Sequence, residues 1–448
     1  MLKDNYGLFP NKKLKDMIVP MFFEQLLVML VGLVDTFVIT YAGESAVSGV
    51  SLVNQFTTIF MYLFTALASG GAVVISQYIG KKEPGNASKT SGQLLMSSTL
   101  ISMVIMTVVL IFNRQLMGLM FGKVDSDVMN ACLTYLRITA ISYPFIAIYN
   151  AGASLFRSLG KTSVTMKISI VSNVVNLVLD FICVMVLRWG VAGVAWPTVL
   201  ARALSAVAIT YLAFSKKNPV HFTVNNIFTW DGSLLKKVLS IAVPNGVENG
   251  VFQLVKVALS SVVAMFGTYQ IAANGVAQSI WSLAAVFGMA MAPVFTTVVG
   301  QCMGSGNKDA AAFYIKKLMA INVVLSTLWN GIVLAITPII LSFNNLSEET
   351  RHLVLILVII HNVFNSFALP FSGNLGTGLR AAGDVKYTML VSIASTVFGR
   401  GVLSLIFALV FNMGVIGIAF AMCADWCIRG FVFLLRYKSK KWQNFRVV

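Results

Sequence analysis

A small polar set interrupts an otherwise apolar stretch of the sequence. The run "SNVVNLVLDF", inside residues 166–187, carries Asn173, Asn176 and Asp180. Residues four apart are neighbours on one face of a helix, so Asn176 and Asp180 are expected side by side, with Asn173 one turn earlier. Two amides and a carboxylate on one helix face have the chemistry to hold a cation or to pass a proton.

The rest of the sequence is that of a membrane protein. Of its 448 residues 57% are hydrophobic and only 11% are charged, and the mean hydropathy is +0.83. Soluble chains carry about 25% charged residues. Apolar runs of roughly 20 residues, long enough to cross a bilayer as helices, recur from end to end. We predict an all-α polytopic membrane protein with twelve spans, at 17–41, 52–79, 93–113, 130–156, 164–187, 191–214, 238–266, 270–298, 315–343, 352–378, 386–411 and 414–436.

A carboxylate at membrane depth costs about 2.5–3.5 kcal/mol, so it usually faces a cavity and marks an ion or proton path. Asp35 in the first span and Thr198 in the sixth are the other candidates to join Asn176 and Asp180. Together they form an all-oxygen set that suits a hard cation such as Na⁺. The two carboxylates could instead share a proton, or the set could be a polar clamp between helices that binds nothing.

The sequence is a duplication. Four short motifs return in the same order at a nearly constant offset, the one that separates Pro20 from Pro244: "PMFFEQ" as "PNGVEN", "SQYIG" as "GQCMG", "FRSLG" as "LRAAG" and "GVAGVA" as "GVIGIA". Six helices per copy keep both copies in the same orientation, as in transporters built from parallel repeats. We therefore predict two six-helix lobes around a central cavity: residues 1–214, a cytoplasmic linker at 215–237, and residues 238–448.

The basic residues predict the orientation in the membrane. The termini and even-numbered loops hold 24 of the lysines and arginines, whereas the odd-numbered loops hold four. By the positive-inside rule, both termini are expected in the cytoplasm. The net charge of +17 thus reflects topology. Because these charges are dispersed over many short loops, we do not expect a nucleic-acid partner.

The combined motifs resemble the multidrug and toxic compound extrusion (MATE) family over nearly the whole chain. The resemblance rests on Pro20 with Asp35, "SQYIG", "FRSLGKT", "NVVNLVLD" and "GVAGVAWPT" in the first half, and on "PNGVEN", "GQCMG", "LRAAGD" and "GVIGIA" in the second. It implies two six-helix lobes, a central cavity, and cation-driven export of mostly cationic or amphipathic organic molecules.

The resemblance also implies where coupling occurs. Similar MATE proteins hold a cation in the N-terminal lobe, with residues whose counterparts here are Asp35, Asn176, Asp180 and Thr198. The second copy lacks both carboxylates, since the offset from Pro20 to Pro244 carries these four positions to Leu259, Arg400, Ser404 and Met422. Some relatives use an Asp of helix 10 for a second site, but "HNVFNSFALPF" contains none. The chain is therefore expected to be closer to relatives with cation coupling in the N-terminal lobe.

A second group of polar residues is expected to line the substrate cavity. Its members follow a proline in the first helix of each lobe or lie in the fourth span: Glu24, Gln25, Asn150, Asn245, Glu248 and Asn249. The alternatives are that these residues satisfy backbone groups freed by Pro20 and Pro244, or that Glu248 pairs locally. In the last span, Asp425 and Arg429 are four apart and are expected to form an intrahelical ion pair.

We therefore predict a secondary antiporter that exports cationic or amphipathic small organic compounds in exchange for Na⁺ or H⁺. The alternative is a flippase for lipid-linked oligosaccharides, in which Lys256 and Arg400 would face a pyrophosphate. An embedded enzyme is not expected, because no catalytic His, Asp or metal cluster is visible at one membrane face. We expect no cofactor, no metal beyond possible Na⁺ at the four coupling residues, a monomer, and a multi-pass protein of the bacterial plasma membrane.

Overall fold

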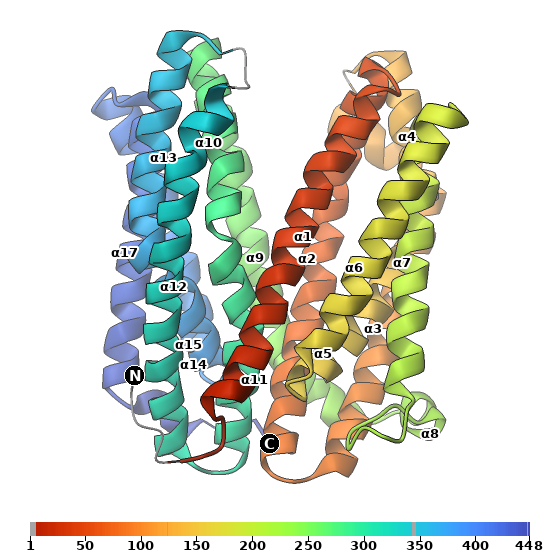
Figure 1. Cartoon of the computed structure of the whole chain (residues 1–448), viewed down its shortest axis with the longest axis vertical. Coiled ribbons are helices and arrows are strands. Elements are labelled where there is room, and N and C mark those ends of the chain that lie inside the picture. The colour runs from red at the N-terminus through yellow and green to blue at the C-terminus, as the bar shows by residue number, and fades with distance from the viewer. Residues whose placement is uncertain (1–5, 123, 343–345, 446) are drawn as a thin grey trace. The chain divides into compact units, whose positions relative to one another are not determined.

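The computed structural model describes residues 6–122, 124–342, 346–445 and 447–448, and every regular element in these ranges is a helix (Figure 1). Lys3, Lys123 and Arg446, counted in the charge argument above, lie outside them. Eleven described helices are long and apolar enough to cross a membrane, or up to twelve spans if one bent pair counts as a single span. The prediction of an all-helical polytopic membrane protein is confirmed.

The chain divides into two compact units, which we call the first unit, Val19–Val243, and the second unit, Met1–Ile18 with Pro244–Val448. The divisions lie beside Pro20 inside α1 (Asn11–Thr40) and at Pro244 inside α9 (Gly232–Val263). A proline lacks the amide hydrogen of a regular helical turn. Both divisions therefore coincide with positions where the helical hydrogen bonding is interrupted.

The first unit contains most of α1 and the start of α9. Between them lie α2 (Glu44–Gly80), α3 (Pro84–Phe121), α4 (Ser126–Ala140), α5 (Tyr143–Ser158), α6 (Thr162–Phe181), the π-helical turn η1 (Ile182–Val186), α7 (Val191–Ala213) and α8 (Val224–Phe228). The expected fourth span is the bent pair α4 and α5, which meet at 45°. Pro144 at the start of α5 suits this break, because proline fits the first helical turn. The segment 215–237 packs within this unit, where α8 contacts α3.

The second unit contains the rest of α9 and the remaining elements. These are η2 (Ala264–Phe266), α10 (Thr268–Ala284), α11 (Val286–Gly304), α12 (Lys308–Ser342), α13 (Glu348–Leu369), η3 (Pro370–Leu375), α14 (Gly376–Ala381), α15 (Val385–Ala394), η4 (Ser395–Val402), α16 (Leu403–Leu405), η5 (Ile406–Val410), α17 (Gly414–Lys438) and η6 (Lys441–Asn444). The expected span at 270–298 consists of α10 and α11, divided at Ala285, whereas its counterpart α2 is continuous.

The duplication is visible in the packing of one glycine in each unit. A Cβ on Gly193 would lie 2.9 Å from the carbonyl oxygen of Cys183, and a Cβ on Gly417 would lie 2.9 Å from that of Phe407. The two pairs are equivalent positions of the two copies, related by the offset between the repeated motifs. Glycine permits close backbone approach. The repeated "GVAGVA" and "GVIGIA" motifs therefore serve the same packing contact in both units.

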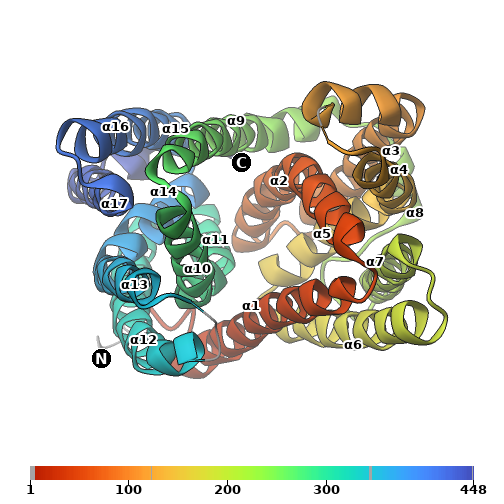
Figure 2. The ribbon, with the colours of Figure 1, turned by 90° about the horizontal axis from the view of Figure 1, so that it is seen from above.

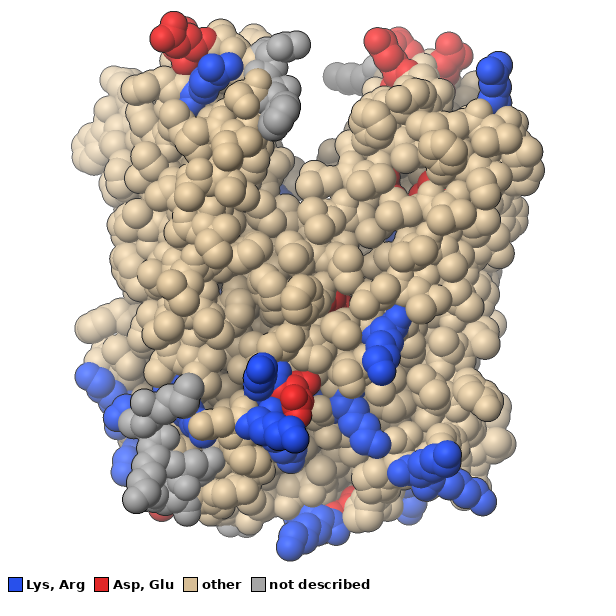
Figure 3. Space-filling view, in the orientation of Figure 1, with Lys and Arg blue, Asp and Glu red and all other residues tan. Residues whose placement is uncertain are grey.

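The polar residues of the first unit lie on neighbouring helices, and the surface charges lie apart from them. In the first unit α1 and α6 run side by side in Figures 1 and 2, and a side-chain hydrogen bond joins them. Within each unit, Figure 3 shows most of the visible lysines and arginines towards one end, while much of the remaining visible surface is uncharged. A concentration of basic residues at one end of each unit is expected if every second loop carries most of the lysines and arginines.

Candidate functional site

The structure brings Asp35, Asn176 and Asp180 together in the first unit. The side-chain amide of Asn176 donates to Asp180 Oδ2 at 2.6 Å and lies 3.4 Å from Asp35 Oδ1. The carboxyl groups of Asp35 and Asp180 lie close enough to interact directly. Two carboxyl groups can make such a contact when they share a proton, and a cation between them removes the same repulsion.

The charge and burial of this cluster favour one bound monovalent cation. Asp180 is completely buried, and its Oδ1 has no hydrogen-bond partner among the described residues. Arg202 lies within electrostatic range of Asp35, while its Nη1 donates to Ser142 Oγ at 2.7 Å. Two carboxylates and one guanidinium leave an excess of one negative charge. A buried charge is costly unless it is compensated, so a proton or Na⁺ at Asp180 would remove the imbalance.

Thr198 is not brought into this cluster. Its hydroxyl donates to the carbonyl oxygen of Val194 at 2.9 Å, one turn back in α7, and no described contact joins it to either carboxylate. Asn173 donates to Ser169 at 3.3 Å and likewise takes no described part in the Asn176–Asp180 contact. Hydroxyl groups in helices commonly bond to the carbonyl four residues earlier. The role of Thr198 as a fourth ligand stays a prediction.

In the first unit, Glu24 is held in a buried ion pair. Arg157 Nη2 donates to Glu24 Oε1 at 2.6 Å, and the hydroxyl of Thr165 donates to Oε2 at 2.7 Å. Tyr149 lies within electrostatic range of this carboxylate. Glu24 thus joins α1 to α5 and α6, and its charge is compensated by Arg157.

The second unit repeats this arrangement. Arg380 Nη1 donates to Glu248 Oε2 at 2.8 Å and to Asn245 Oδ1 at 3.1 Å. Sequence reasoning did not predict that Arg157 and Arg380 are the partners of the two glutamates. The signal was available, because "FRSLG" and "LRAAG" return at nearly the same offset as the glutamate motifs.

The remaining expected cavity residues are partly buried. Gln25 and Asn150 lie in the first unit and Asn249 in the second. The backbone carbonyl of Asn150 accepts from Ser154 Oγ at 2.9 Å, and no described hydrogen bond involves its side-chain amide. A shared cavity lined by Glu24, Glu248 and these residues stays a prediction.

The charged residues of α17 form a second buried cluster. The expected Asp425–Arg429 ion pair is confirmed at 2.7 Å. Arg400, which the sequence alone did not place, lies 3.3 Å from the same carboxylate. No group of three or more His, Cys, Asp or Glu side chains in the described ranges could hold a metal ion.

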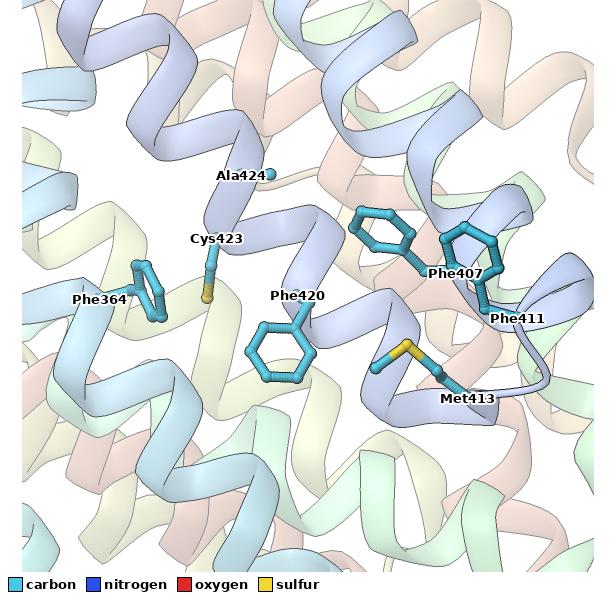
Figure 4. A pocket seen from close by; sticks show the side chains of 7 residues that line it. All are labelled: Phe364, Phe407, Phe411, Met413, Phe420, Cys423 and Ala424. Carbon is cyan, nitrogen blue, oxygen red and sulfur yellow. The ribbon is translucent and has the colours of Figure 1, made fainter.

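A pocket of about 370 Å³ lies in the second unit beside this cluster (Figure 4). It is apolar, and its lining comes from α13, from η5 with the residues that follow it, and from α17: Phe364, Phe407, Phe411, Met413, Phe420, Cys423 and Ala424. Cys423 points between Phe364 and Phe420, so the aromatic rings and the thiol face a common space.

Comparison with known proteins identifies the family to which this chain belongs. The MatE family model matches residues 20–182 and 244–405, once in each half of the chain. The chain is 25% identical to the uncharacterized transporter YisQ of Bacillus subtilis over 94% of this chain and 93% of that protein. It is 23% identical to the probable multidrug resistance protein NorM of Thermotoga maritima over 98% and 97% of the two chains.

A solved structure shares the fold. The outward-facing conformation of a multidrug resistance MATE family transporter of the MOP superfamily matches with a TM-score of 0.85 at 19% identity, covering 98% of both chains. Two repeated helical halves and the double family match define a multi-pass membrane transporter rather than an enzyme. The chain belongs to the MatE family, the MATE family of multidrug efflux transporters.

Proposed function

We propose that this transporter exports cationic or amphipathic organic compounds in exchange for one monovalent cation, Na⁺ or H⁺, that binds at Asp35 and Asp180. The observation that carries the proposal is the buried Asp180 carboxylate, which has an oxygen without a described partner and contacts a second carboxyl group. Asn176 orients both carboxylates, and Thr198 in the next helix is the proposed fourth ligand. The name of NorM, a probable multidrug resistance protein, supports the substrate class.

The duplication supports coupling in the first unit. Leu259, Arg400, Ser404 and Met422 replace the four coupling residues in the second copy. A cation would meet Arg400 there, whereas it meets an excess negative charge at Asp35 and Asp180. We therefore place this chain with the MATE transporters that couple through the N-terminal lobe.

Coupling requires that the cation bind the two transport states unequally, because a ligand shifts an equilibrium only by its difference in affinity for the two states. Pro20 lies in the same helix as Asp35, about four helical turns earlier. A proline lets a helix bend. We propose that neutralising Asp35 and Asp180 changes the bend of α1 and thereby releases the drug. The substrate path includes Glu24, Gln25, Asn150, Asn245, Glu248 and Asn249.

Transport of a fluorescent cationic dye into everted membrane vesicles tests this function and identifies the ion. Vesicles that contain the wild-type protein receive either an outward Na⁺ gradient, with Na⁺ higher in the lumen, at constant pH, or an outward proton gradient, with an acidic lumen, without Na⁺. The proposal predicts concentrative dye uptake with at least one gradient, and none in vesicles without the transporter. If neither gradient drives dye uptake, the antiporter function is contradicted, and the lipid-linked oligosaccharide flippase becomes the hypothesis to test.

A further inference from the structure

The second unit contains a buried cluster with one positive charge in excess. Asp425 has no exposed surface, and both of its carboxylate oxygens accept from Arg429 Nη2 at 2.7 Å. Arg400, which is 7% exposed, places its Nε 3.3 Å from the same carboxylate. The guanidinium of Arg400 also lies 4.7 Å from the ring centre of Phe252. One carboxylate therefore faces two guanidinium groups.

Several polar groups beside the excess charge lack a partner among the described residues. The Nε of Arg400 has no well-formed hydrogen bond, although it lies 3.3 Å from Asp425 Oδ2. Ser404, one helical turn beyond Arg400, has a buried hydroxyl without a partner, and His361 has two buried ring nitrogens without one. His361 lies within electrostatic range of Arg400. These groups can supply hydrogen bonds to an acceptor.

The duplication gives this cluster a clear counterpart. Arg400 and Ser404 occupy the positions of the second copy that Asn176 and Asp180 occupy in the first, at the same helical spacing of four. In the first unit, two carboxylates and Arg202 leave one negative charge in excess. In the second unit, two arginines and Asp425 leave one positive charge in excess. The same place in the repeated fold therefore has opposite polarity in the two units.

A purely structural ion-pair network would explain Asp425 and Arg429, but it does not explain Arg400. An uncompensated buried charge is strongly unfavourable, and a carboxylate already paired with Arg429 gains little from a second guanidinium at a longer distance. The unpartnered groups at Ser404 and His361 add to this cost, because buried polar groups normally have partners. A bound anion would remove both deficits.

We propose that the second unit binds one monovalent anion, a halide or an organic carboxylate, at Arg400, with Ser404 and His361 donating further hydrogen bonds. Arg400 provides the charge, and the hydroxyl of Ser404 and the imidazole of His361 provide directed donors. The apolar pocket in Figure 4 includes Cys423, which is within electrostatic range of Arg400, so an aromatic carboxylate is a suitable probe. This site is separate from the cation-coupling residues of the first unit.

The test is an anion titration of the purified full-length protein in detergent at fixed Na⁺ concentration, pH and ionic strength. Chloride or benzoate replaces sulfate, and the thermal unfolding midpoint is recorded at each step. A ligand that binds only the folded state raises this midpoint in a saturable way. We expect saturation with chloride, benzoate or both in the wild type: chloride alone identifies a halide site, and benzoate alone identifies a carboxylate site.

Variants assign the response to the cluster. Arg400→Gln should abolish it, and Ser404→Ala should raise the half-saturating concentration by about tenfold, as expected for one lost hydrogen bond to a charged group. Arg351→Gln, which removes an exposed arginine of the same unit, should titrate like the wild type. Ser404→Ala removes only a hydroxyl, so it provides a test even if Arg400→Gln does not fold. A wild type without saturable response, or an unchanged response in Ser404→Ala and in any folded Arg400→Gln protein, would overturn the proposal.

Discussion

Arg157 and Glu24 form a buried ion pair with an Nη2–Oε1 distance of 2.6 Å, and the duplicated half repeats it as Arg380 and Glu248 at 2.8 Å. The residues of each pair come from different repeated motifs. The first helix of each repeat is thus fixed to a helix that follows later in the same repeat. The ion pair occurs in both copies, whereas the carboxylates at Asp35 and Asp180 occur only in the first copy.

The first prediction concerns the stability that the Glu24–Arg157 pair provides. Glu24→Gln leaves a partly buried guanidinium without its carboxylate, and breaking a buried pair typically costs about 3–5 kcal/mol. We expect a clear fall in the thermal unfolding midpoint of the purified protein. Lys81→Gln, which breaks the exposed Lys81–Glu83 pair, is the control and should cost at most about 1 kcal/mol.

A double-mutant cycle completes this test. If Glu24 and Arg157 act on each other, the Glu24→Gln and Arg157→Gln effects should combine to less than their sum. Additive losses in the double variant would show that the two side chains stabilise the protein independently, contrary to the ion pair.

The second prediction concerns Glu248 as a residue of the substrate path. Removing its charge while keeping its size, as in Glu248→Gln, should weaken resistance to cationic compounds more than resistance to neutral ones, because only cations are attracted by the carboxylate. Resistance is measured in cells with matched amounts of transporter in the membrane. An equal loss for all compounds together with less protein in the membrane would assign Glu248 to structural support alone.

The third prediction concerns orientation. Both termini and the 215–237 segment are proposed to face the cytoplasm, because basic residues favour that side. Single cysteines at the exposed positions Glu44 and Lys216, introduced by Glu44→Cys and Lys216→Cys in a cysteine-free background, should react with an impermeant reagent from opposite faces. Labelling of both positions from the same face would rule out this topology.

The helical architecture and the contact between Asn176 and Asp180 could be predicted from the sequence because both depend on local spacing. Apolar runs of span length give the helices, and the spacing of four places Asn176 beside Asp180. Asp35 was predicted to join them because carboxylates are rare inside membrane spans, and the structure places it 3.4 Å from the amide of Asn176. The breaks at Ile141 and Ala285 could not be read from hydropathy, because the apolar pattern continues through them.

Contacts that depend on tertiary structure could not be predicted in the same way. Thr198 has the right chemistry for the cluster, but its hydroxyl bonds to the carbonyl of Val194 in its own helix. Arg157 reaches Glu24 from a distant part of the sequence, and only the common offset of their motifs relates them there. Arg400 lies near Asp425 because α17 packs on η4, which no local pattern indicates.

The central claim is that Asp35 and Asp180 bind the coupling cation, and gradient-driven transport in proteoliposomes tests it most directly. Wild type, Asp35→Asn, Asp180→Asn and Asn173→Ala proteins are reconstituted at equal density, and drug uptake is measured with the active gradient and without it. Asn173→Ala is the control, since Asn173 bonds to Ser169 on the same helix and has no described contact with the carboxylates. The account predicts that Asn173→Ala retains gradient-driven uptake, whereas each Asp→Asn protein folds and binds drug but transports no faster with the gradient than without it. Full gradient-driven uptake by both Asp35→Asn and Asp180→Asn would contradict it.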